Sequence, residues 1–326
     1  MFDYKALHSP SVCMFKNDMY VAFYAGESEC VNQSVFVFKK STGGKMSLFY
    51  KFKEGTGNPV LFTVNDNLYC AYSVFTRPFT NNVFDLWRTT YTSILNLSQD
   101  NIDEDKAILL STYCCPRANP FYFKDGSVML PCYDEEIQRG VMFHIGKSKY
   151  ITRGTCLSRH PVIQPSIFYK NGFRILYRNF QQPRPASQSF APTCKMALSM
   201  AQNRILYSDT SYTKIPNNNE SIIGFNDDSG ASYTVYNAVP GRKELTLALL
   251  DEDNGVLTPK PIIQLNEEEK ASYPNHCYNK RGQLVVTYTS YGDMGINNGS
   301  KIAISTVSKN YKKVLSTTYI TPDDLK

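Results

Sequence analysis

Three side-chain amides occupy the same place in the sequence, directly before a proline that opens an apolar run. They are Asn58, Asn119 and Gln164. An amide both donates and accepts hydrogen bonds, so a ring of amides around a channel would suit the hydroxyl groups of a sugar. The alternative is that each amide only caps the turn into its strand. The sequence leaves both interpretations open.

One tryptophan and one long loop add further candidates. Trp87 is the only tryptophan of the chain, and its indole ring could stack on a sugar face or fill a core. A proline-rich stretch over residues 181–192 is long enough to overhang a binding site and to bring Arg184 to a ligand. We therefore treat Trp87 as a candidate substrate-binding residue.

Composition excludes several classes of protein. The 326 residues are 42% apolar and 20% charged, which is typical of a globular protein. The net charge of +6 is scattered along the chain, so no basic stripe indicates nucleic-acid binding. No apolar run is long enough to cross a membrane, and the N-terminus shows no signal peptide.

The nine cysteines follow no metal-binding or disulfide pattern. None makes a C-x-x-C pair, no Cys/His group has zinc spacing, and their number is odd. We expect free thiols in apolar strands, and we expect neither a metal nor a cofactor. A reducing environment follows, which favours the cytoplasm or a viral or phage particle as the location.

An internal repeat supplies the elements that must position the candidate residues. Five segments share a proline, a short apolar stretch, a polar turn and an apolar run that usually carries a tyrosine. They start at Pro10, Pro59, Pro120, Pro165 and Pro274. The last gap is about twice the others, and a weaker copy without proline fills it over residues 221–236. Six copies of about 54 residues each thus cover the chain.

Each copy predicts a β-hairpin. Asn-Asp, Asp-Gly and Asn-Gly pairs favour tight reversals, and the flanking runs are rich in β-branched and aromatic residues. Further short strands are expected between the copies, over residues 34–38, 140–145, 245–250 and 301–307. Repeats of about four strands each are typical of a β-propeller. Two stacked sandwiches are the alternative, but they would leave the regular period unexplained.

We therefore predict an all-β fold, a six-bladed β-propeller. The whole chain, residues 1–326, is expected to form one propeller domain, with inner hairpins that start near residues 10, 59, 120, 165, 220 and 274. We also expect the segment before His8 to add a strand to the last blade and so close the ring.

Seven fragments, in the same order along the chain, resemble the sialidase-related family of BNR-repeat proteins. They lie at residues 8–12, 26–29, 57–62, 125–131, 164–178, 236–245 and 272–289. The resemblance implies a six-bladed sialidase-like propeller and, in active members of the family, release of terminal sialic acids by a retaining mechanism. The Asp-box turns of the family survive only as remnants at residues 41–47 and 251–258, without their tryptophan.

The resemblance implies roles for three residues. Arg178 and Arg242 match two of the three family arginines that hold the carboxylate of the sugar, a task that suits the planar guanidinium fork. Tyr273 aligns with the nucleophilic tyrosine of the family, whose phenol needs a carboxylate to take its proton. The alternatives are two surface arginines and a tyrosine packed at a strand end.

Two positions depart from the family pattern. His8 stands where the first family arginine would lie, and an imidazole is shorter and only partly charged at neutral pH. Gln164 stands where the glutamate base would fall, and an amide cannot take a proton. We keep both residues as candidates for substrate binding.

Three glutamates could replace the missing carboxylates. Glu27 or Glu29 could supply the catalytic acid, and Glu268, within an acidic run just before Tyr273, could place a carboxylate beside that tyrosine. A solvated loop carboxylate is the alternative for each of them. Of these, we carry Glu29 and Glu268 forward as catalytic candidates.

These observations predict a sialidase-like, carbohydrate-active protein whose partner is a carbohydrate, with a carboxylate-bearing sugar as the first choice. It would be an exo-glycosidase with a diverged site, or else a non-catalytic glycan-binding or protein-interaction propeller. A five-bladed glycosidase fold is a third option. Losing the first arginine, the base and the acid should remove much of the transition-state stabilisation, so hydrolysis of ordinary sialosides is not expected.

Overall fold

The structure is a computed structural model that describes residues 3–76, 83–146, 151–155, 161–180, 190–199, 204–207, 210–217, 219–266 and 269–325. The chain divides into two compact units. The first unit is Met1–Asn119 with Tyr273–Lys326, and the second unit is Pro120–Ser272. In the described ranges, no helix has the length and apolar character needed to span a membrane.

The first unit is built from four-stranded antiparallel sheets whose strands follow chain order. One sheet consists of β1 (Ala6–Phe15), β2 (Asp18–Gly26), β3 (Ser34–Lys40) and β4 (Met46–Glu54), and the next of β5 (Thr56–Val64), β6 (Asn67–Phe75), β7 (Thr90–Asn96) and β8 (Ile108–Thr112). The last sheet consists of β23 (Lys270–Tyr278), β24 (Leu284–Tyr291), β25 (Lys301–Val307) and β26 (Val314–Ile320). Short elements complete the unit: β9 (Cys115–Pro116), α1 (Val83–Arg88) and the 3-10 helices η1 (Glu104–Lys106) and η4 (Pro322–Leu325).

The second unit repeats the same layout. Its sheets contain β10 (Phe121–Tyr122), β11 (Val128–Asp134), β12 (Arg139–Ile145) and β13 (Ile151–Thr155), then β14 (Val162–Tyr169), β15 (Phe173–Asn179), β16 (Phe190–Ser199) and β17 (Arg204–Tyr207), with β18 (Ser211–Pro216) paired to β16. The last sheet contains β19 (Ile223–Asn226), β20 (Ser232–Asn237), β21 (Leu245–Asp253) and β22 (Val256–Gln264). Each sheet is thus an antiparallel meander.

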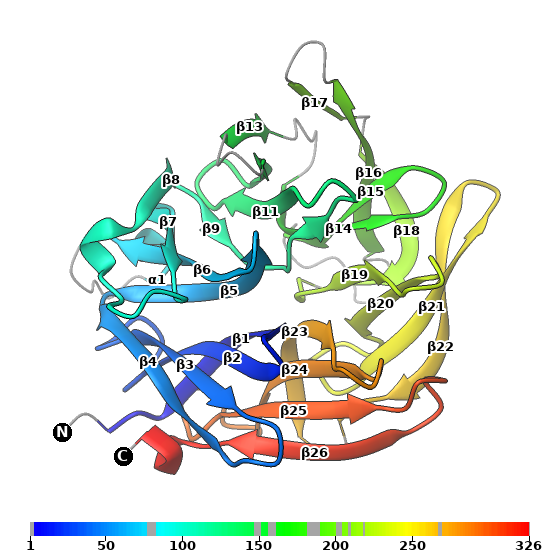
Figure 1. The fold of residues 1–326 in the computed structure, drawn as a ribbon. Coiled ribbons are helices and arrows are strands. Elements are labelled where there is room, and N and C mark those ends of the chain that lie inside the picture. The colour runs from blue at the N-terminus through cyan, green and yellow to red at the C-terminus, as the bar shows by residue number, and fades with distance from the viewer. Residues whose placement is uncertain are drawn as a thin grey trace. The chain divides into compact units, whose positions relative to one another are not determined.

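These meanders are the blades of an all-β, six-bladed β-propeller, which confirms the predicted fold class. Figure 1 shows the blades in the order of the colour scale, from β1–β4 in blue to β23–β26 in orange and red. The first two strands of each blade occupy one of the six hairpin segments read from the sequence. That the whole chain is one domain stays a prediction.

The turn residues explain why these segments reverse direction so tightly. Asn65 and Asp66 have φ of 49° and 57° between the paired residues Val64 and Asn67. Two consecutive left-handed residues form the two-residue turn whose twist matches that of a β-hairpin. Asn and Asp tolerate this conformation better than other side chains do, so the polar pairs in the repeat fix the register of each hairpin.

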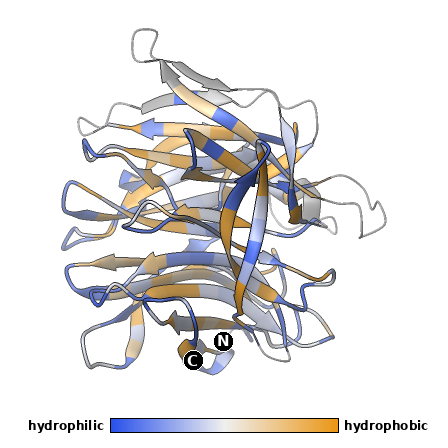
Figure 2. Ribbon diagram, turned by 90° about the vertical axis from the view of Figure 1, so that its right-hand side faces the viewer, coloured by the Kyte–Doolittle hydropathy of each residue, from blue (hydrophilic) through white to orange (hydrophobic). Residues whose placement is uncertain are grey.

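The apolar faces of neighbouring blades form the cores. In the first unit, Leu7 and Val12 of β1 pack in one buried cluster with Val285 of β24 and with Ile302 and Ile304 of β25. Burying each such side chain contributes about 1.5–3 kcal/mol. Figure 2 shows the same pattern, with hydrophobic residues along the strands and hydrophilic ones in the turns. All eight cysteines that the structure describes are free thiols.

The expectation for the N-terminal segment is wrong. Ala6 and Leu7 belong to β1, the first strand of the first blade, and the last blade takes all its strands from residues 270–320. The segment meets the last blade through the Lys5 carbonyl, which accepts the backbone N–H groups of Gly299 and Ser300 at 3.2 and 3.1 Å, and through Leu7, whose N–H and carbonyl both bond the Ser300 hydroxyl. A strand there would need a ladder of such bonds, and β1 already uses those residues to pair with β2.

Candidate functional site

A strained residue before proline recurs in the first strand of four blades. Ser9, Asn58, Gln164 and Tyr273 have φ of 55°, 42°, 52° and 57°, and each precedes a proline. In β1, β5 and β14 the pairing register shifts at this point, as in a β-bulge. A left-handed non-glycine residue costs about 1–3 kcal/mol, and proline suits a bulge because it has no N–H to donate. The bulge takes the residue out of the strand's alternation, so it can aim a side chain away from the ladder.

In the first unit, this bulge brings Tyr273 against two other residues. The ring of Tyr273 lies 4.2 Å from that of His8, in an edge-to-face arrangement at 61°. The guanidinium of Arg117 lies 4.8 Å from the centre of the same phenol ring. Two predicted residues, His8 and Tyr273, are thus close together, and sequence reasoning missed the third.

Arg117 is held by backbone carbonyls. It is only 2% exposed, and its terminal nitrogens donate to the carbonyls of Pro10 at 3.5 Å and Pro274 at 3.2 Å. These prolines lie within the first strands of the first and last blades, so the arginine ties β1 to β23. A charged side chain inside an apolar segment such as Cys-Cys-Pro-Arg-Ala-Asn-Pro is the signal that could have identified it.

Trp87 belongs to a cluster of buried aromatic rings near His8. The His8 ring is 5.5 Å from the ring of Tyr24, which is 6.0 Å from the Trp87 ring. Trp87 is 8% exposed and also packs edge-to-face on Phe75 at 5.0 Å. This packing is that of a core tryptophan, and contact of Trp87 with a sugar stays a prediction.

Glu29 is hydrogen-bonded to a tyrosine of the same aromatic cluster. The phenol of Tyr24 donates to Oε1 of Glu29 at 3.3 Å, and the backbone N–H of Glu29 donates to Asn297 at 2.9 Å. Glu29 is half-buried and belongs to the same unit as Tyr273. Its role as an acid stays a prediction, and Glu268 lies outside the described residues, as does Arg184.

The three amides have different surroundings. Asn58 and Gln164 are 4% and 3% exposed, and both sit at the strained bulge position. Asn119 is half-buried, and its side chain donates to the carbonyl of His276 within the first unit. Asn58 and Gln164 belong to different units, and a ring of amides stays a prediction.

In the second unit, Arg178 and Arg242 face one buried carboxylate, that of Glu220. Glu220 is 4% exposed, and its Oε1 accepts the backbone N–H of Arg242 at 3.1 Å. Arg178, at the end of β15, donates from Nε to Oδ1 of Asn219 at 2.9 Å. Arg178 is 8% exposed, whereas Arg242 is half-buried with φ of 64°. The two predicted arginines are thus brought to one place.

The loop that carries Glu220 is fastened to the end of β15. The backbone N–H of Asn179 donates to the side chain of Asn217 at 2.9 Å, and the Asn217 amide donates to the Glu220 carbonyl at 2.8 Å. These bonds place the carboxylate beside Arg178, which is next to Asn179 in the strand. Sequence reasoning missed Glu220 because it ends a polar run, Asn-Asn-Asn-Glu, that is typical of a solvated loop.

Burial raises the pKa of Glu220 to about 7, although the positive charges of Arg242 and Arg178 act in the opposite direction. Desolvation therefore outweighs two guanidinium groups. Near neutral pH, a large share of Glu220 is protonated, and the two arginines then carry charge that Glu220 does not neutralise. A carboxyl group with so large a pKa shift is a candidate member of a functional site.

In the described part of the chain, no three His, Cys, Asp or Glu side chains are grouped so that they could hold a metal ion.

Comparisons with known proteins agree with this fold. The model of a family described as BNR repeat-like domain matches residues 41–286, which is more than half of the chain. No curated protein matches the sequence significantly.

Solved structures with the same fold include two sialidases. The NanB sialidase of Streptococcus pneumoniae is 8% identical with a TM-score of 0.65, and the match covers 98% of this chain and 68% of that one. For Trypanosoma rangeli sialidase the identity is 10%, the TM-score 0.61, and the coverage 92% and 54%. A protein of unknown function from Dyadobacter fermentans is 11% identical with a TM-score of 0.63, and coverage is 90% and 93%. At these identities the similarity establishes the fold.

Proposed function

The chain belongs to the BNR repeat-like domain family, and on this premise we propose that it binds a carboxylate-bearing sugar through Arg178 and Arg242. One observation carries the proposal: buried Glu220 accepts the backbone N–H of Arg242, and Arg178 is bonded to the neighbouring Asn219, so that the positive charges of both arginines act on one carboxyl group. A buried carboxyl with a strongly shifted pKa beside charged partners is a marker of a functional site.

The arrangement suits recognition of a carboxylate. Asn219 fixes Nε of Arg178, and this contact orients the planar fork of the guanidinium. A guanidinium meets a carboxylate through two parallel N–H donors, which adds direction to the charge attraction. Protonation of Glu220 removes the competing negative charge, so a sugar carboxylate should bind best where Glu220 is neutral.

Sialic acid is the first probe, because Trypanosoma rangeli sialidase has been solved in complex with it. We expect calorimetric titration of the full chain at pH 6 to show binding that Arg178→Ala and Arg242→Ala each weaken by at least about tenfold, because a charge-assisted pair is lost. Arg178→Lys keeps the charge but loses the fork, so it should also bind more weakly than the wild type.

Arg281→Ala is the matched control, because Arg281 is an exposed arginine of the first unit. It should bind sialic acid as the wild type does. If Arg178→Ala and Arg242→Ala bind as tightly as Arg281→Ala, the carboxylate clamp is wrong. Circular dichroism of each variant checks that the fold is kept.

Hydrolysis of a glycoside is a second candidate function, and one observation favours it. The guanidinium of Arg117 lies over the ring of Tyr273, and a nearby cation stabilises a phenolate. Arg117 would lower the cost of forming the phenolate nucleophile in a chain that has an amide, Gln164, where the family has its glutamate base. The phenol proton of Tyr273 would pass to solvent water, and the phenolate oxygen would bond to the anomeric carbon as the bond from that carbon to the leaving oxygen breaks. Glu29 would protonate the leaving oxygen, and a water molecule would then replace Tyr273 on the anomeric carbon and return a proton to the phenolate.

A fluorogenic sialoside separates the two functions. If the chain hydrolyses the sialoside, it releases the fluorophore, and Tyr273→Phe abolishes this release. The variant keeps the ring against His8 but removes the nucleophilic oxygen. Tyr319→Phe, at an exposed tyrosine, should leave it unchanged. Binding of sialic acid without any release of fluorophore would identify a binding protein.

A further inference from the structure

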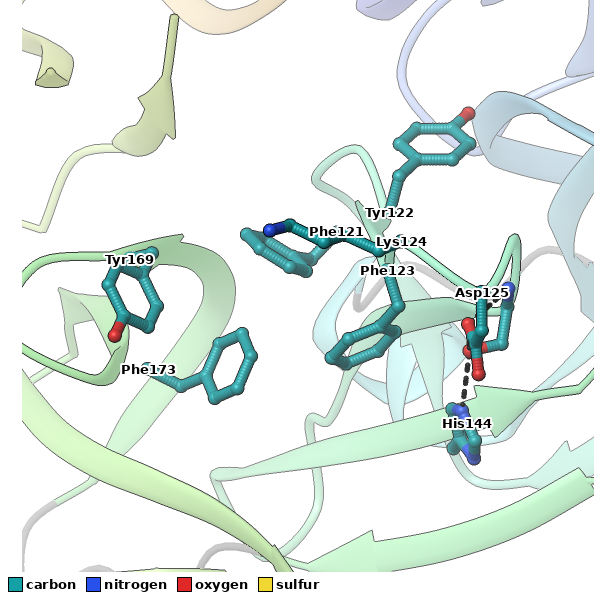
Figure 3. Close-up of a pocket in the computed structure, with 9 residues that line it drawn as sticks. Phe121, Tyr122, Phe123, Lys124, Asp125, His144, Tyr169 and Phe173 are labelled. Atoms are coloured by element: carbon teal, nitrogen blue, oxygen red, sulfur yellow. Dashed lines mark hydrogen bonds between the residues drawn. The ribbon is translucent and has the colours of Figure 1, made fainter. Parts of the chain in front are cut away.

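The second unit contains a cavity of about 740 Å³ that the proposed function does not use (Figure 3). One wall comes from the β10–β11 hairpin, over residues 121–127, and another from His144 on β12. The remaining wall is formed by Tyr169 and Phe173, which flank the turn between β14 and β15. The volume is in the range of ligand pockets.

Three phenylalanine rings form an aromatic floor. Phe173 lies 5.2 Å from Phe121 and 5.5 Å from Phe123, and these two rings are 5.3 Å apart; all three contacts are edge-to-face. Each of the three is only partly buried. Tyr122 and Tyr169 are 48% and 49% exposed, and Figure 3 shows them on opposite sides of the floor. Because the three rings meet edge-to-face, they form no single flat surface, and the cavity offers separate apolar ring faces bordered by two phenols.

A hydrogen-bonded chain forms the polar end. Oδ1 of Asp125 accepts the N–H and the hydroxyl of Ser127 at 2.9 and 2.7 Å, and Nε2 of His144 lies 2.9 Å from the same hydroxyl oxygen. The single hydroxyl proton goes to Asp125, so His144 must donate through Nε2. Ser127 is therefore not set up as a nucleophile, which would have to donate its proton to the histidine. The order of these bonds indicates binding rather than catalysis.

The cavity is lined by one charged group of each sign. Lys124 and Asp125 carry opposite charges, and Figure 3 shows the Lys124 side chain extending toward Phe121, away from Asp125 and His144. A balanced set of donors and acceptors beside aromatic faces fits a ligand that has hydroxyl groups on its edge, an apolar C–H face and no net charge. A pyranose ring has this chemistry.

We propose that this cavity binds a neutral pyranose, with its C–H face on the phenylalanine floor and its hydroxyls toward Asp125 and His144. The site is distinct from the arginine pair. Phe173 is the first residue of β15, and Arg178 lies five residues later in the same strand. A strand rises about 3.3 Å per residue, so the two sites are about 16 Å apart at opposite ends of β15. A glycan chain or a second glycan could occupy both, and this proposal does not depend on the arginines.

Saturation-transfer NMR on the full chain tests the proposal, with the methyl pyranosides of glucose, galactose, mannose and N-acetylglucosamine as probes. We expect transfer to the ring C–H protons of at least one probe, and a loss of about threefold or more in Tyr122→Ala and in Tyr169→Ala. Tyr319→Ala, which removes another 48% exposed tyrosine outside the cavity, should keep the full signal. Tyr169→Leu serves if Tyr169→Ala does not fold.

The two proposals fail in different ways. Arg178→Ala should leave the transfer to neutral pyranosides unchanged, whatever it does to sialic acid. Three results would each overturn the cavity site: no transfer to any of the four probes, full transfer in both tyrosine variants, or loss of transfer in Arg178→Ala.

Discussion

At the scale of single residues, the feature with most chemical consequence is a buried glutamate between two arginines. Burial raises the pKa of Glu220 to about 7, above the usual 4.5 of a glutamate. The folded chain therefore holds a proton on Glu220 between these two pH values, while the unfolded chain does not. The extra proton on Glu220 stabilises the fold fully below about pH 4.5, and this contribution is lost as pH rises through about 7. The free energy of unfolding falls with rising pH wherever the folded state binds more protons than the unfolded state.

This linkage gives a testable pH dependence. Between pH 4.5 and pH 8, the free energy of unfolding should fall by about 3 kcal/mol more in the wild type than in Glu220→Gln, which has no proton to lose. Chemical denaturation at several pH values measures it. Glu54→Gln, at an exposed glutamate, should follow the wild type. Parallel curves for the wild type and Glu220→Gln would contradict the buried acid.

The same proton should control binding. As pH rises from 6 to 8, Glu220 becomes charged and competes for the arginines, so the wild type should lose affinity for sialic acid. Glu220→Gln should keep nearly constant affinity over this range. Calorimetric titration at both pH values measures the effect, and an equal loss in the wild type and the variant would show that another group is responsible.

A second prediction at this scale concerns Gly57, a glycine next to the aromatic cluster around Trp87. A Cβ at Gly57 would lie 2.9 Å from Cη2 of Trp87 and 2.5 Å from the amide nitrogen of Gln33. Gly57→Ala should therefore lower the free energy of unfolding by about 1–3 kcal/mol through overpacking. Gly292→Ala, where a Cβ would meet no atom within 4 Å, is the control. Equal melting temperatures of the two variants would show that the aromatic cluster rearranges to accommodate the added methyl group.

Not every functional residue could be predicted at this scale. The resemblance to the family pointed to Arg178 and Arg242, because they match two family arginines in the expected order after the repeat hairpins. Glu220 and Arg117 depend on distant partners: a loop fastened by Asn179 in one case, and carbonyls more than a hundred residues away in the other. No local pattern in the sequence indicates such contacts.

At the scale of elements, an ion pair between blades links the turn of β14–β15 to β21. Nη2 of Arg174 lies 2.7 Å from Oε1 of Glu252, and these side chains are 4% and 14% exposed. The side chain of Asn171 donates to Oε2 of the same glutamate at 2.8 Å. Glu252 therefore holds both sides of the turn, and loss of its charge would leave a buried guanidinium without a counterion.

We expect Glu252→Gln to lower the free energy of unfolding by about 2–3 kcal/mol, since breaking a buried pair at one partner is costly. Urea denaturation measures the change, with Glu244→Gln as an exposed control in the same unit. A difference below about 0.5 kcal/mol would place this pair with surface ion pairs, which contribute little.

Hairpins could be predicted from the sequence, but the bulges within them could not. Asn-Asp and Asn-Gly pairs mark the turns because these residues tolerate positive φ. The strained residue before proline is Ser9 in one blade and Tyr273 in another, and neither type favours that conformation. The bulge is imposed by the pairing of whole strands, so it is invisible to residue preferences.

At the scale of the whole molecule, the period of the sequence repeat was enough to predict the fold. Identity to solved sialidases is only 8–10%, yet the strand order of the blades is the same kind of meander throughout. Apolar alternation and turn pairs are enough to specify such a blade, whatever the individual residues. The place of the N-terminal segment was less predictable, because Ala6 and Leu7 pair with β2 while Lys5 and Leu7 also hydrogen-bond residues 299–300 before β25.

Because the same fold occurs at such low sequence identity, the function must be argued from the residues of individual sites. The arginine pair with Glu220 supports recognition of an acidic sugar, and the aromatic cavity supports a neutral one. These two preferences differ in charge, so ligands that differ only in charge separate them.

The most direct measurement is therefore the affinity of the wild-type chain for sialic acid and for its methyl ester, by calorimetry at pH 6. The ester keeps the sugar ring but lacks the negative charge that Arg178 and Arg242 would hold. We predict that sialic acid binds at least about tenfold more tightly than the ester. Equal affinity for the two ligands, or no binding of either, would contradict recognition of a sugar carboxylate by the arginine pair.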